Sequence, residues 1–175
     1  MEIWYTFTGT IDSNSINQLI TWLSGQVYSG QNIEKLKLFI SSNGGDMDSA
    51  IRAYTYLKSL PFRVETIGFT QIDSAANVIF LAGQRRTAVS GCRFFLHEGT
   101  FSGNQVAPLH IHEETLKVMQ DLYKRYVDIF AKELKKSDEE MRVILKTGDI
   151  LTTNDAKTKY GLVHDVVETI PLIKG

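Results

Sequence analysis

The sequence predicts an α/β fold in which helices cover a mostly parallel sheet. Segments rich in β-branched and aromatic residues alternate along the chain with segments whose apolar residues recur at helical spacing. This strand–helix–strand order is typical of βαβ units, whose right-handed crossovers place consecutive strands parallel. The 175 residues, 43% of them hydrophobic and 22% charged, suit a single globular domain spanning residues 1–175.

The first half of the chain is expected to alternate between strands and helices. Strands are expected at residues 3–8, 35–41 and 63–69, where β-forming and aliphatic residues gather. Two amphipathic helices connect them, one beginning at the capping residues Asp12 to Asn14 and the other carrying apolar residues from Met47 to Leu57. A short apolar helix from Ala75 to Leu81 follows the third strand and is expected to be buried.

The second half is expected to hold two short strands near residues 87–89 and 93–97, a long helix over about 111–134, two short capped helices and a last strand over 163–170. Apolar residues line one face of the long helix: Leu116, Met119, Leu122, Tyr123, Tyr126, Ile129 and Phe130. This is more apolar surface than a small domain readily covers, so we expect a homo-oligomer that uses this helix at its interface.

Composition and charge argue against several functional classes. A formal net charge of −1 argues against a nucleic-acid-binding module. No apolar run approaches the roughly 18 residues of a membrane span, and no signal peptide is visible. Cys92 is the single cysteine and cannot form an internal disulfide, so a cytoplasmic location is expected. His110 and His112 alternate along the chain and converge poorly, so neither a metal nor another cofactor is expected.

Two unusual turns lie where predicted strands end, at the edge of a parallel sheet where ligands bind. Gly44 and Gly45 follow one strand, and Ser74 opens the short apolar helix after the next. A helix N-terminus offers unpaired N–H groups that stabilise an oxyanion. Taken alone, however, a serine here is more often a helix cap, and Gly-Gly is more often a plain turn. No Lys-Ser/Thr pair follows Gly45, which argues against a phosphate-binding loop.

His97 and Asp149 also have ordinary structural interpretations when each is considered alone. His97 ends an apolar strand and could be a core histidine bonded to a backbone carbonyl. Asp149 follows Gly148 and could be a turn or cap residue.

Together these features resemble the Clp protease proteolytic subunit family, which has the ClpP/crotonase-like fold. Four segments carry the resemblance, in the order found in that family: residues 38–45, 68–77, 94–97 and 151–163. They cover nearly the whole chain. The resemblance implies repeated ββα/βαβ units, a mostly parallel sheet and a long protruding handle helix, for which residues 111–134 are the candidate.

The resemblance also implies a serine-type endopeptidase that hydrolyses peptides or unfolded proteins. Ser74 corresponds to the nucleophile, His97 to the general base and Asp149 to the acid that orients the imidazole. The backbone N–H groups of Gly45 and Ala75 correspond to the oxyanion hole. Residues 98–110 would help line the substrate groove, and the handle helix would build a ring-shaped assembly with a closed chamber.

Departures from the family pattern leave alternatives open. The family's aspartate falls on Gly148, one position before Asp149, so Asp73 as the acid and a Ser–His dyad are alternatives. The family's N-terminal segment, which contacts an AAA+ unfoldase, is missing, so an unfoldase partner is doubtful. Two other functions also remain: a crotonase-type acyl-CoA enzyme, which shares the oxyanion hole but uses carboxylates, and a catalytically inactive assembly subunit.

Overall fold

The computed structural model describes residues 1–100, 106 and 108–171, and its centre is a sheet. Five strands run parallel in the order β1–β2–β3–β4–β7. Their bounds are Glu2–Thr8 (β1), Lys35–Ser42 (β2), Arg63–Asp73 (β3), Arg85–Val89 (β4) and Asp165–Val167 (β7). Strand β5 (Arg93–Leu96) pairs in parallel with the end of β3, and β6 (Asp149–Leu151) pairs antiparallel with β5.

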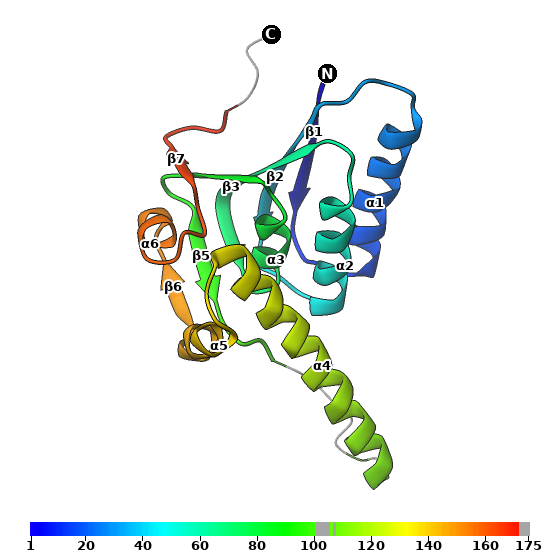
Figure 1. The fold of residues 1–175 in the computed structure, drawn as a ribbon, viewed down its shortest axis with the longest axis vertical. Helices are drawn as coiled ribbons and strands as arrows, with labels where there is room; N and C mark the ends of the chain where they lie inside the picture. The colour runs from blue at the N-terminus through cyan, green and yellow to red at the C-terminus, as the bar shows by residue number, and fades with distance from the viewer. Residues whose placement is uncertain (101–105, 107, 172–175) are drawn as a thin grey trace.

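Helices cover this sheet, and one of them projects away from it (Figure 1). Their bounds are Ser13–Tyr28 (α1), Met47–Lys58 (α2), Ala76–Leu81 (α3), Leu109–Leu134 (α4), Asp138–Thr147 (α5) and Thr153–Thr158 (α6). Helices α1 and α2 lie side by side, and α4 packs against the body only through its C-terminal half. No helix in the described part of the chain has the length and apolar character needed to cross a bilayer.

The predicted α/β fold with a mostly parallel sheet is confirmed, and β3 is longer than the expected strand over residues 63–69. Its pairing with β2 shifts, because Ile40 lies opposite Gly68 whereas Ser42 lies opposite Ile72. Strand β3 therefore takes up two extra residues before it ends. Its first half pairs with β4 and its second half with β5, so its last residue, Asp73, reaches the strand that leads to His97.

Two elements near the C-terminus differ from the expectation. Strand β6 was not expected, because its three residues, Asp-Ile-Leu, are too few to show a periodic pattern. It forms only by pairing with β5, which is distant in the sequence. The last strand is confined to Asp165–Val167, shorter than the expected 163–170, because it pairs only with Thr87 to Val89 of β4.

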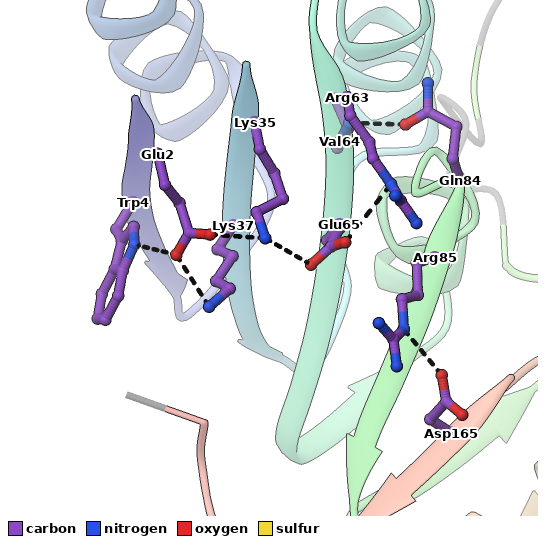
Figure 2. Close-up of polar contacts among 10 residues, drawn as sticks. All are labelled: Glu2, Trp4, Lys35, Lys37, Arg63, Val64, Glu65, Gln84, Arg85 and Asp165. Carbon is purple, nitrogen blue, oxygen red and sulfur yellow. Dashed lines mark hydrogen bonds and ion pairs between the residues drawn. The ribbon is translucent and has the colours of Figure 1, made fainter. Parts of the chain in front are cut away.

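Charged side chains occupy one face of the sheet (Figure 2). Glu2 binds Lys35 at 2.6 Å and Lys37 at 2.8 Å, and Lys35 also lies 3.7 Å from Glu65. Burial alone would raise the pKa of Glu2, but its hydrogen bonds to the two lysines lower the pKa to about 2. Along β1 and β2 these residues alternate with core residues such as Ile3 and Leu36, so the charged side chains share one face of these strands and the core residues share the other.

Helix α3 lies inside the molecule, as expected for the apolar run after β3. All of its residues are buried, including the polar Asn77. The turn that enters this helix is therefore held between the sheet and the helices, and it carries Ser74.

Candidate active site

Ser74 occupies a constrained turn between β3 and α3. Its φ angle is +56°, in the left-handed region, which costs a non-glycine residue about 1–3 kcal/mol. Its backbone N–H donates to the carbonyl oxygen of Phe95 at 2.9 Å. The N-cap residue of α3 is Ala75, without a side-chain cap. Within the described residues the Ser74 hydroxyl has no hydrogen-bond partner, so the helix-cap interpretation does not apply to it.

The Gly44-Gly45 turn lies directly against the Ser74 turn. A Cβ atom on Gly44 would lie 2.7 Å from both the Asp73 carbonyl oxygen and the Ser74 Cβ, and one on Gly45 would lie 2.2 Å from the Ile11 carbonyl oxygen. Both glycines also have positive φ angles, +89° and +144°. Only glycine therefore fits at these two positions.

Two unused backbone donors lie at this junction. In the described part of the chain, neither the Gly45 N–H nor the Ala75 N–H donates to a protein acceptor. Both residues line the same cavity as Ser74. Free N–H groups beside a hydroxyl suit the stabilisation of an oxyanion that forms on a carbonyl attacked by that hydroxyl.

His97 lines this cavity together with Ser74. The cavity has a volume of about 530 Å³, and its lining also includes Asn43, Asp46, Met47, Asp73, Phe95, Gly99, Thr100 and Leu122. The imidazole stacks on the Phe95 ring, with the ring centroids 4.5 Å apart. Burial lowers the pKa of His97, and the negative charge of Asp73 offsets part of that effect. A lowered pKa favours the neutral ring, which is the form that a general base requires.

The hydrogen bonding of His97 differs from that of a working triad. The Gly99 N–H donates to His97 Nδ1 at 3.1 Å, so Nδ1 carries a lone pair and the ring proton lies on Nε2. Ser74 and His97 do not hydrogen-bond in this arrangement. A proton can pass from the serine to Nε2 only after the ring releases Gly99 and becomes protonated at Nδ1. In the structure the two groups are therefore not in contact for proton transfer.

Asp149 is not brought to His97. It begins β6 and lies opposite Leu96, so its side chain shares the Leu96 face of the strand rather than the His97 face. Its carboxylate accepts a hydrogen bond from the Tyr160 hydroxyl at 2.7 Å. The cavity thus gathers Ser74, His97, Gly45 and Ala75, but not Asp149. In the continued ladder, Gly148 is the residue that falls opposite His97.

Asp73 is the carboxylate nearest to the nucleophile in sequence, and it also lines the cavity. It lies opposite Phe95 in the β3–β5 pairing, on the face that Phe95 shares with His97. Its carboxylate forms an ion pair with Arg93, whose guanidinium also binds the Gln71 side chain at 3.3 Å. Asp73 is thus bound towards the start of β5, whereas His97 follows its end.

Some residues of the cavity were not singled out from the sequence. The apolar periodicity of the helices predicts core positions for Met47 and Leu122, yet both are half-buried and line the cavity. Of the expected groove segment 98–110, Gly99 and Thr100 line the cavity, whereas residues 101–105 and 107 lie outside the described residues. The sequence carries one further signal at this site, because Asn77 is polar within an otherwise apolar run.

Comparison with known proteins identifies the family of this chain. The family model for Clp protease matches residues 4–170. The chain belongs to the Clp protease family. Membership of this family places it among the serine endopeptidases.

Individual Clp relatives match along most of their length. A proteolytic subunit 2 from Corynebacterium jeikeium is 29% identical over 168 residues, covering 93% of this chain and 78% of the relative. A proteolytic subunit 1 from Thermobifida fusca is 27% identical over 162 residues, covering 90% and 70%. The solved structure of a ClpP1 mutant from Listeria monocytogenes shares the fold, with a TM-score of 0.82 at 21% identity over 95% of this chain and 91% of that one.

Proposed function

We propose that this Clp family member hydrolyses peptide bonds with Ser74 as nucleophile and His97 as general base. One observation carries the proposal: among the described residues, an unused serine hydroxyl in a left-handed strand-to-helix turn shares a cavity with a histidine and two free backbone N–H groups. The proposed substrates are peptides or unfolded proteins in the cytoplasm.

In the proposed reaction, Ser74 Oγ attacks the peptide carbonyl while His97 takes the hydroxyl proton. The N–H groups of Gly45 and Ala75 then bind the negative charge that develops on the carbonyl oxygen. His97 returns the proton to the leaving amine, and water releases the acyl group from Ser74 by the same steps in reverse.

The proposal includes Asp149 as the third member of the triad. Its backbone lies one residue along the β5–β6 ladder from the position opposite His97. In the working site, a shift of one residue in this loop would turn its carboxylate from Tyr160 to His97 Nδ1–H as the ring leaves the Gly99 N–H. That exchange would place the ring proton on Nδ1 and leave Nε2 free to accept from Ser74.

A serine-reactive fluorophosphonate tests the function and its pH dependence together. We expect covalent labelling at Ser74, located by mass spectrometry of the digested protein. The labelling rate should rise with pH through a midpoint below 6.5, because burial lowers the pKa of His97 and the neutral ring is the reactive form.

The Asp73→Asn variant sharpens this test. Asp73 raises the pKa of His97, so removing its charge should move the midpoint to still lower pH. Labelling at another residue, or no labelling of the wild-type protein, would favour an acyl-CoA enzyme or an inactive assembly subunit.

We also propose a homo-oligomer built through α4. The N-terminal half of this helix projects from the body with Leu116 and Val118 exposed by 55% and 67%, whereas Tyr126 and Phe130 near its other end are buried (Figure 1). A second copy would remove those apolar side chains from water. Light scattering at micromolar concentration should give a mass several times 19.7 kDa, and a monomeric mass would contradict this proposal.

A further inference from the structure

Helix α3 carries a buried polar side chain that takes no part in the proposed reaction. Asn77 is 0% exposed and lies three residues after Ser74. Its Nδ2 group donates to the carbonyl oxygen of Ser74 at 3.0 Å and to that of Phe95 at 2.9 Å. One side chain therefore joins the serine turn to the strand that leads to His97.

Backbone hydrogen bonds close the same connection. The Ser74 N–H also donates to the Phe95 carbonyl oxygen, at 2.9 Å, and the Asn77 N–H also donates to the Ser74 carbonyl oxygen, at 3.1 Å. Each of the two carbonyl oxygens thus accepts twice. Because Ser74 has a φ angle of +56°, these bonds hold a backbone conformation that a serine does not favour by itself.

The other end of the amide group is unpaired. Among the described residues, Asn77 Oδ1 is the buried side-chain polar atom that has no hydrogen-bond partner. Rotating the amide by 180° would not help, because Oδ1 would then face two carbonyl oxygens, which only accept. Burying an unpaired acceptor costs stability, so an apolar residue would serve the core better here.

We propose that Asn77 is a positioning residue that fixes Ser74 relative to His97. This inference rests on the proposed function. Asn77 is buried with its Oδ1 atom unpaired, which costs stability. Its two donated hydrogen bonds offset this cost by setting the distance and direction of the serine hydroxyl from the imidazole. Positioning of this kind affects the rate of the chemical step more than substrate binding, because small displacements of a reacting group are costly.

The Asn77→Ala variant separates this role from stability. Both carbonyl oxygens keep a backbone donor in the variant and the unpaired Oδ1 is removed, but the truncation leaves a cavity, so the melting temperature should fall by about as much as in the Val78→Ala control described next. We expect kcat for a fluorogenic peptide to fall about 10- to 100-fold, with KM within about threefold. The rate of fluorophosphonate labelling at Ser74 should fall by a similar factor.

Val78→Ala is the matched control. Val78 is also 0% exposed on α3, but its side chain makes no hydrogen bond to the turn. Its truncation leaves a cavity and should lower the melting temperature by about 5 °C or more, while kcat stays within about threefold of wild type. Asn77→Asp keeps the shape but replaces the donor group with an acceptor, so its kcat should fall at least as far as in Asn77→Ala.

The possible results distinguish this inference from the proposed function. A wild-type protein that neither hydrolyses peptides nor labels at Ser74 would overturn the proposed function and this inference with it. An active wild type whose Asn77→Ala variant keeps its kcat would overturn the inference alone. Equal losses of kcat in Asn77→Ala and Val78→Ala would also overturn it, because they would assign Asn77 to packing.

Discussion

Replacement of Ser74 by alanine is expected to abolish peptide hydrolysis, with a loss in kcat of about 10⁶-fold. Among the described residues that line the cavity, Thr100 carries the one other hydroxyl, and it belongs to the segment after His97 and not to the turn that faces Gly45. The measurement is the hydrolysis of a fluorogenic peptide by purified wild-type and Ser74→Ala protein at equal concentration.

The same substitution should leave the fold almost unchanged. The Ser74 hydroxyl has no partner among the described residues, so its removal leaves no buried donor or acceptor unsatisfied. Alanine keeps the Cβ atom, and the strain of the left-handed turn is therefore the same. The free energy of unfolding should change by less than about 0.5 kcal/mol, and the mass of the assembly should not change. Equal turnover by the two proteins would disprove the nucleophile assignment.

Replacement of Asp149 by asparagine is expected to lower kcat by about 10⁴-fold, because the imidazole loses both its preferred tautomer and the partner of its cation. Stability should change little. The asparagine oxygen can still accept the Tyr160 hydroxyl, which is the one side-chain hydrogen bond that the structure gives Asp149. Peptide hydrolysis and thermal unfolding, measured on the same preparation, test both parts of this prediction.

Tyr160→Phe is the control for the exchange of partners. It removes the hydroxyl that binds Asp149 in the structure and should leave kcat within a few-fold of wild type. If Asp149→Asn keeps nearly full activity, the carboxylate serves only Tyr160. The acid is then Asp73 if Asp73→Asn lowers kcat strongly, and the site is a Ser–His dyad if neither substitution does.

The sequence alone determined the fold class and the order of most elements. Apolar residues at helical spacing, as at Ile16, Leu19 and Leu23 of α1, are buried because one stripe of an amphipathic helix must face the core. The apolar run after Ser74 could only form a buried helix, and it does. The positions of Ser74 and His97 after strands placed both at one edge of the sheet, and the resemblance to the Clp protease motifs assigned them as nucleophile and base.

Only the tertiary structure decided how the site residues face one another. Pairing between segments far apart in the chain decides three features: the register shift in β3, the existence of β6 and the face of β6 on which Asp149 lies. A shift of one residue turns a side chain to the other face of a strand, and no local pattern reports that shift. The two hydrogen bonds of Asn77 depend likewise on α3 packing beside β5, so a polar residue in an apolar run acquires its role only in the folded chain.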